Sequence, residues 1–107
     1  MITIGNKNKG ELGEYVGRGS SLGNPYKFSY DCGAERERVI EQYRNWLYRK
    51  LNQLNSEVTK EMERLYQIAK SGDLILLCWC VPKKCHAEVI KEVLEFWLNE
   101  EITKDLH

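Results

Sequence analysis

The chain has 107 residues, which is enough for one domain with a single modest hydrophobic core. Sixteen basic residues balance sixteen acidic ones, whereas a domain that grips a nucleic-acid backbone is normally basic. This balance disfavours a nucleic-acid polymer as the main partner. It still allows a small anionic ligand, because the local charge of a site can differ from the total. We expect a single domain over residues 1–107.

Neither a membrane span nor a secretion signal is predicted. The longest apolar run, residues 74–81, is much shorter than the ~20 residues that a membrane helix needs. The amino-terminal residues lack the charged-then-apolar order of a signal peptide. Without secretion, the four cysteines are expected to stay reduced, as in a cytosol. We therefore expect a cytoplasmic protein that does not bind membranes.

The first part of the chain predicts short strands separated by loops. Residues 2–4 (Ile-Thr-Ile) are β-prone and predict a first strand. The polar, glycine-containing residues 5–13 indicate a loop. Residues 15–16 (Tyr-Val) predict either another short strand or an anchored turn. Residues 17–25, here called the glycine loop, form the most irregular stretch of the protein.

Three helices are predicted from apolar positions that recur at helical spacing. The first covers residues 34 to about 52. Asn55 or Ser56 can cap a second helix, which ends at residues 71–72 because glycine commonly follows the last helical residue. A third helix follows the central strand, and the tail from Glu100 is expected to fray. The three apolar stripes consist of Val39, Ile40, Tyr43, Trp46, Leu47, Leu51 and Leu54; Val58, Met62, Leu65, Tyr66 and Ala69; and Val89, Ile90, Val93, Leu94, Trp97 and Leu98.

Residues 74–80 predict a buried central strand. An unbroken apolar run of this length is typical of a parallel strand that is covered on both faces. The order strand, loop, helix, helix, strand, helix predicts an α/β fold, with a small Rossmann-like sheet and about three helices. Short strands within residues 7–30, or pairing across a homo-oligomer interface, would complete the thin sheet. Open α/β folds bind ligands at the carboxyl ends of their strands, so we expect the site there.

The glycine loop predicts a binding site for an anion. Its glycines, Gly17, Gly19 and Gly23, allow positive φ angles and close approach of a ligand to the backbone. The exposed N–H groups, together with Arg18 and Ser20, could hold a phosphate or a carboxylate. The spacing matches neither a P-loop nor the dinucleotide-binding fingerprint. The alternative is a tight surface loop with no ligand.

Cysteine and histidine gather where the central strand leads into the third helix, and three hypotheses fit them. A zinc site is the first, and its four candidate ligands are Cys78, Cys80, Cys85 and His86. Their spacing differs from the usual C-x₂₋₄-C pairs, so no metal or other cofactor is favoured. The second is a catalytic thiolate at Cys85 with His86 as its acid–base partner. In the third, the cysteines are small buried side chains and His86 contacts a ligand.

Lys83 and Lys84 add positive charge to this region. If Pro82 is the first helical residue, both lysines stand in the first turn, where positive charge opposes the helix dipole. Such a placement is tolerated when an anion binds to the helix start; otherwise both side chains simply extend into solvent. Arg44 could reach the same pocket, since arginine binds phosphate in a bidentate manner, or it could belong to a solvated helix face.

Three motifs occur in a fixed order along the chain. They are Tyr-Val-Gly-Arg-Gly-Ser-x-Leu-Gly-Asn-Pro at 15–25, Val-Ile-x-x-Tyr-Arg-x-Trp-Leu at 39–47 and Cys-Trp-Cys-x-Pro-x-x-Cys-His at 78–86. Together they resemble a small phage and bacterial family catalogued as domain of unknown function 4326, over most of the chain. The resemblance carries no reaction with it, but the occurrence of the family in phage genomes implies a role in nucleotide metabolism, DNA modification or counter-defence. The residues that it singles out are Arg18, Gly19, Ser20, Asn24, Arg44, Cys78, Cys80, Cys85 and His86.

The leading hypothesis is a binding module for a small phosphorylated or nucleotide-derived ligand. The glycine loop and residues 82–86 would form two edges of one pocket, and in a phage the module would sequester a nucleotide signal in the host cytoplasm. The alternative is an enzyme that acts on a nucleotide or nucleobase through Cys85 or His86, with or without zinc. Arg18 and His86 belong to no apolar stripe, so both are expected in the pocket and outside the core. The predicted ligand-binding residues are Arg18, Gly19, Ser20, Asn24, Arg44, Lys83, Lys84, Cys85 and His86.

Overall fold

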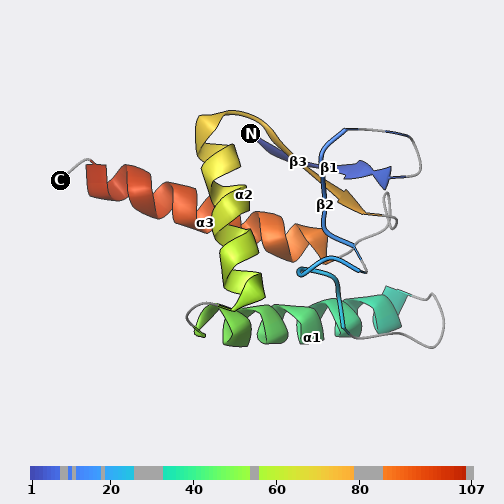
Figure 1. Ribbon diagram of the computed structural model, residues 1–107. Helices are drawn as coiled ribbons and strands as arrows, with labels where there is room; N and C mark the ends of the chain where they lie inside the picture. Colours follow the sequence, from blue (N-terminus) through green and yellow to red (C-terminus); the bar gives the residue numbers. More distant parts are fainter. Residues whose placement is uncertain are drawn as a thin grey trace.

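Three parallel strands form one sheet with the predicted buried strand at its centre. The computed structural model describes residues 1–7, 10, 12–17, 19–25, 33–53, 56–78 and 86–105. The elements in chain order are β1 (Ile2–Asn6), β2 (Glu14–Tyr15), α1 (Gly33–Leu51), α2 (Glu57–Ser71), β3 (Leu74–Cys78) and α3 (Ala87–Asp105). The strand order β1-β3-β2 and the three helices confirm the predicted α/β fold (Figure 1).

β3 is the central strand because its apolar residues are covered on both faces of the sheet. It pairs with β1 along its whole length, from Ile2 opposite Leu74 to Asn6 opposite Cys78. Every residue of β3 except Ile75 is buried, as the continuous apolar run predicts. β3 ends at Cys78, and the last two residues of the strand predicted at 74–80 lie outside the described residues.

The third strand, β2, comes from within the chain, which is one of the two predicted ways of completing the sheet. β2 is only two residues long and pairs with the opposite edge of β3. Gly13, just before β2, allows the two backbones to approach closely. A Cβ atom at Gly13 would lie only 2.6 Å from the carbonyl oxygen of Ile75. A side chain at this position would therefore push β2 away from the sheet.

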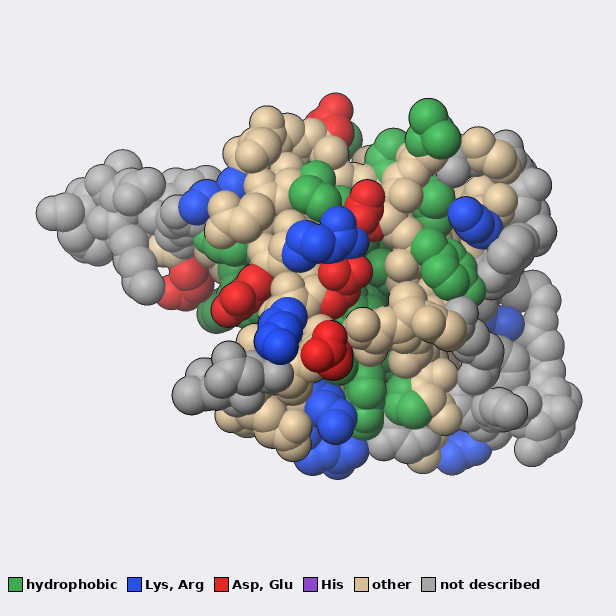
Figure 2. All heavy atoms as spheres, viewed as in Figure 1, with side chains coloured by type: hydrophobic (Ala, Val, Ile, Leu, Met, Phe, Trp, Pro, Cys, Tyr) green, Lys and Arg blue, Asp and Glu red, His purple; other side chains and the backbone are tan. Residues whose placement is uncertain are grey.

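Ion pairs connect β2 to α2 on the surface. Arg64 of α2 lies 2.6 Å from Glu14 of β2 and 2.6 Å from Glu61 on its own helix. The hydrogen bonds that Arg64 donates to Glu61 and to Glu14 raise its pKa above the ordinary arginine value. Acidic and basic side chains are interspersed over the centre of this face (Figure 2). Because Arg64 is half exposed and both carboxylates are partly open to solvent, each pair contributes only modestly to stability.

The boundaries of α1 and α2 agree with their sequence signals. α1 occupies Gly33–Leu51, close to the predicted range. Ser56, one of the two predicted caps, precedes α2, and its Oγ accepts a hydrogen bond from the Thr59 N–H at 3.0 Å. At the other end, the Gly72 N–H donates to the carbonyl oxygen of Ile68 at 3.1 Å. These caps satisfy backbone groups that the helix ends leave without intrahelical partners.

The boundaries of α3 differ from the prediction at both ends. The helix begins at Ala87 rather than at Pro82, so Lys83 and Lys84 precede its first turn. At the other end, the helix continues to Asp105, past Glu100, from which the tail is expected to fray. Among the described helices, none combines the length and the apolar character that crossing a membrane requires.

The helices pack on one another as well as on the sheet. α2 crosses in front of α3, and α1 lies along the opposite side of the molecule from β1 (Figure 1). Where α2 meets α3, the rings of Tyr66 and Trp97 are 5.7 Å apart in an edge-to-face arrangement, which is favourable for aromatic pairs. The largest fully buried side chains are Tyr43, Leu22, Leu47, Met62, Leu65, Leu74, Leu76, Leu77, Ile90, Leu94, Val16 and Val39.

Candidate functional site

The carboxyl ends of all three strands meet at one edge of the sheet, here called the carboxyl edge. β1 ends there at Asn6, and Lys7 follows it. β3 ends there at Cys78, directly opposite Asn6. β2 leads there through Val16, whose N–H donates to the carbonyl oxygen of Leu77 at 3.0 Å. The glycine loop therefore starts at the edge where open α/β sheets bind ligands.

The glycine loop folds into two consecutive turns. The Ser20 N–H donates to the carbonyl oxygen of Gly17 at 3.1 Å, and the Ser20 Oγ donates to the same oxygen at 2.7 Å. The Gly23 N–H in turn donates to the carbonyl oxygen of Ser20 at 3.0 Å. Gly19 has a φ angle of +94°, which only glycine adopts readily. Ser20 is thus joined to Gly17 by two hydrogen bonds.

Two buried side chains hold the glycine loop against the helices. The Tyr43 hydroxyl of α1 donates to the carbonyl oxygen of Leu22 at 2.7 Å, and the Leu22 side chain itself is fully buried. Nε2 of His86, just before α3, lies 2.5 Å from the carbonyl oxygen of Val16. Since a carbonyl oxygen can only accept, Nε2 of His86 carries the hydrogen and donates it. The loop is therefore anchored at Val16, the residue just before it, and again at Leu22.

His86 and Tyr43 also contact each other. Their rings are 4.9 Å apart at 65°, an edge-to-face contact, and His86 is only 6% exposed. The expectation that His86 lies outside the core is wrong, because its ring fills the space between Tyr43 and the backbone at Val16. The sequence hides this role, since His86 precedes the apolar stripe of α3. In this structure His86 positions the glycine loop and joins it to the start of α3.

Changing Tyr43 to phenylalanine tests the loop anchor with the smallest possible alteration. Tyr43→Phe keeps the ring that packs on His86 and removes only the donor to Leu22 O. We expect the free energy of unfolding in urea to fall by about 1–2 kcal/mol. Tyr48→Phe, also on α1 but 47% exposed, is the matched control and should change it by less than about 0.5 kcal/mol. Equal effects of the two changes would show that the Leu22 contact does not stabilise the fold.

Arg44, a predicted ligand-binding residue, lies between α1 and α3 with its guanidinium in ion pairs. Nη1 is 2.7 Å from Glu41, and Nε is 3.2 Å from Glu92. The hydrogen bond that Arg44 donates to Glu41 is the largest cause of its raised pKa, and Glu92 adds to it. All three nitrogens of this guanidinium donate to these two carboxylates. Arg44 is therefore a helix–helix link in this structure.

The remaining predicted site residues fall into two groups. Gly19, Ser20 and Asn24 lie in the described part of the glycine loop, and Cys78 is a buried thiol at the end of β3, 1% exposed. The others, Arg18, Cys80, Lys83, Lys84 and Cys85, lie outside the described residues. Within the described ranges, no group of three or more histidine, cysteine or acidic side chains could hold a metal ion.

Two residues at the carboxyl edge were not among the site residues predicted from the sequence. Asn6 and Lys7 stand at the end of β1, where they share the edge with the glycine loop. The signal was available: the predicted strand at residues 2–4 is followed at once by glycine, asparagine and lysine. If this strand is taken as parallel to the central one, its carboxyl end belongs to the same site.

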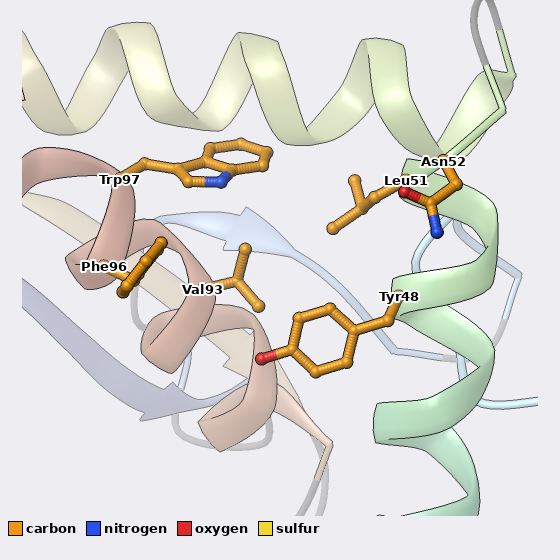
Figure 3. A pocket seen from close by; sticks show the side chains of 6 residues that line it. All are labelled: Tyr48, Leu51, Asn52, Val93, Phe96 and Trp97. Atoms are coloured by element: carbon orange, nitrogen blue, oxygen red, sulfur yellow. The ribbon is translucent and has the colours of Figure 1, made fainter. Parts of the chain in front are cut away.

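A separate pocket lies between α1 and α3, beyond the anchor at Tyr43. Its volume is about 460 Å³. Figure 3 shows Tyr48 and Leu51 of α1 pointing towards Val93 and Trp97 of α3, with Phe96 at the rim. Among the described residues, no charged side chain lines it, so it offers no evident site for an anion. Its residues are Tyr48, Leu51, Asn52, Val93, Phe96 and Trp97.

The fold and the carboxyl edge together define the class of this protein. It is a small parallel α/β domain in which an anchored glycine loop stands at the carboxyl ends of the strands. The model of the family described as Domain of unknown function (DUF4326) matches residues 4–96. The chain belongs to this family. Neither the curated proteins nor the solved structures contain a significant match.

Proposed function

We propose that this protein binds a small phosphorylated or nucleotide-derived ligand at the carboxyl edge, between the glycine loop and residues 82–86. The observation that carries the proposal is the double anchoring of the loop by Tyr43 and His86. A loop held at two points has less conformational freedom to lose when a ligand arrives. Binding then costs less entropy than it would for a flexible loop.

The residues at this edge suit an anion. A Cβ atom at Gly19 would have no atom of the described residues within 4 Å, which leaves room for a ligand to approach the backbone there. Arg18 within the loop, and Lys83 and Lys84 before α3, supply three positive charges in the same two segments of the sequence. His86 links these two segments through Val16. Backbone N–H groups and basic side chains acting together are a common way to hold a phosphate.

The biological consequence that we propose follows from the family resemblance. If the protein is encoded by a phage, a stable complex with a nucleotide signal would withdraw that signal from the defence of the host. The alternative is an enzyme that uses Cys85 or His86 on a nucleotide or nucleobase. His86 is buried and donates from Nε2 to Val16, which favours a positioning role over proton transfer at that nitrogen. Binding without reaction is therefore the preferred proposal.

A thermal-shift panel of nucleotides, cyclic dinucleotides and NAD-derived compounds tests the proposal. A ligand present at 100 times its Kd stabilises the folded state by ~2.7 kcal/mol, which corresponds to a rise in Tm of roughly 10–20 °C for a domain of this size. We expect at least one anionic compound to give such a rise with the wild type. Arg18→Ala should remove the rise without changing the Tm of the protein alone.

The matched control is Arg49→Ala, which removes the same charge from the last turn of α1. This variant should respond to the compound as the wild type does. If no phosphorylated compound raises the Tm of the wild type, the binding proposal is wrong. If the compound is chemically altered during incubation, the enzyme alternative replaces it.

A further inference from the structure

Lys7 stands at the carboxyl edge with its charge placed over an aromatic ring. It follows the last residue of β1 and is exposed to solvent. Its Nζ lies 5.7 Å from the centroid of the Tyr15 ring, a distance at which a cation and an aromatic face attract each other. Within the part of the chain that the structure describes, no carboxylate forms an ion pair with Lys7.

The Tyr15 ring is in turn fixed against the start of the glycine loop. A Cβ atom at Gly17 would lie 2.6 Å from the Tyr15 hydroxyl oxygen and 2.7 Å from Cε1 of the ring. Only glycine therefore leaves room for the ring at this place. The same ring thus contacts both the ammonium group of Lys7 and the start of the glycine loop at Gly17. Lys7 thus belongs to the same edge as the glycine loop although β3 separates their strands.

We infer that Lys7, held by the Tyr15 ring, forms a subsite for the phosphate group of the ligand. This inference rests on the proposed function and deepens it, because it specifies a phosphate or diphosphate rather than a neutral nucleoside. A lysine ammonium keeps three hydrogen-bond donors, so contact with the ring leaves donors available for phosphate oxygens. Arg44, by contrast, is already engaged by Glu41 and Glu92.

The Tyr15 ring explains why Lys7 is suited to binding a phosphate group. A free lysine side chain has several flexible bonds, and ordering it on binding costs entropy. The Tyr15 ring restricts the positions of the Lys7 ammonium before the ligand arrives. Tyr15 is therefore a positioning residue, and Lys7 is the residue that contacts the phosphate.

The test is a titration of the ¹⁵N-labelled protein with inorganic pyrophosphate, followed by NMR at the amides of Gly17, Gly19 and Ser20. Lys7→Gln should weaken pyrophosphate binding roughly ten-fold or more, since a charge-assisted hydrogen bond is lost, and Lys7→Arg should restore most of it. Tyr15→Leu should weaken binding, whereas Tyr15→Phe, which keeps the ring, should not.

The chain offers a matched control for Lys7. Lys70 lies over the Tyr66 ring with Nζ 5.4 Å from its centroid, but it stands in the last turn of α2, which leads to the amino end of β3. Lys70→Gln should change the Kd for pyrophosphate less than about two-fold, as expected for a distant, screened charge.

Two outcomes would overturn the inference about Lys7 and leave the proposed function intact. In the first, pyrophosphate shifts the loop amides of the wild type, but Lys7→Gln leaves the Kd unchanged. In the second, Lys7→Gln and Lys70→Gln weaken binding equally, which would indicate general charge attraction. If neither pyrophosphate nor any compound of the nucleotide panel shifts the loop amides of the wild type, the inference and the proposed function are both wrong.

Discussion

Replacing His86 with alanine is expected to lower the free energy of unfolding by about 2–4 kcal/mol. The change removes a buried ring that packs on Tyr43 and leaves the carbonyl oxygen of Val16 without that donor. For a domain of this size, the loss corresponds to a fall in Tm on the order of 10–20 °C. Urea unfolding followed by circular dichroism measures the first quantity, and calorimetry measures the second.

His86→Ala should also weaken binding of any ligand at the carboxyl edge, because the glycine loop loses one of its two anchors. Hydrogen exchange separates this local effect from the global one. In the variant, the Val16 N–H, which donates to Leu77 O, should exchange faster relative to the amides of α2 than it does in the wild type. The two proteins are compared under conditions that give them the same free energy of unfolding. Glu88→Ala, an exposed change two residues further on, is the control and should alter stability by less than about 0.5 kcal/mol. A stable His86→Ala protein with unchanged exchange would refute the positioning role of His86.

Replacing Gly13 with alanine is expected to destabilise the sheet by about 1–3 kcal/mol, the usual cost of overpacking. The new Cβ would lie 2.6 Å from the backbone oxygen of Ile75 and 3.0 Å from its Cβ. Ile75 belongs to the central strand, so its backbone cannot move without disturbing the pairing with β1. The two-residue strand β2 is the element that must give way. The glycine loop directly follows β2 and would move with it.

The matched control for this change is Gly72→Ala. Gly72 has an extended φ of 168°, and a Cβ atom there would have no atom of the described part of the chain within 4 Å. Alanine should therefore be tolerated there, with a change in unfolding free energy of less than about 1 kcal/mol in either direction. If Gly13→Ala proved as harmless as Gly72→Ala, the close approach of β2 to β3 would not be required for folding.

The elements themselves were predictable because their causes are local. The helical spacing of apolar residues in α1, the Ser56 cap of α2 and the unbroken apolar run of β3 are all visible in short windows of sequence. Signals in short windows of sequence also miss some features of these elements. β2 has two residues and no distinctive pattern, and α3 continues past the point where its apolar stripe ends.

The candidate site was predictable only in part. The glycine loop and the carboxyl end of the central strand follow from glycine spacing and from the general behaviour of parallel sheets. The roles of single side chains did not follow. Arginine commonly binds phosphate, but Arg44 pairs with Glu92 on another helix. The position of Lys7 just after a predicted strand is visible in the sequence, but its contact with the Tyr15 ring across the sheet is not.

The sequence by itself determined the family, the α/β class, the buried central strand and the position of the glycine loop, because each depends on residue types at short range. Only the tertiary structure decided the role of His86. Its partners, Val16 and Tyr43, are remote in the chain and are brought together by the packing of β2, α1 and α3. A histidine's chemistry depends on what surrounds it, and those surroundings exist only after the core has formed.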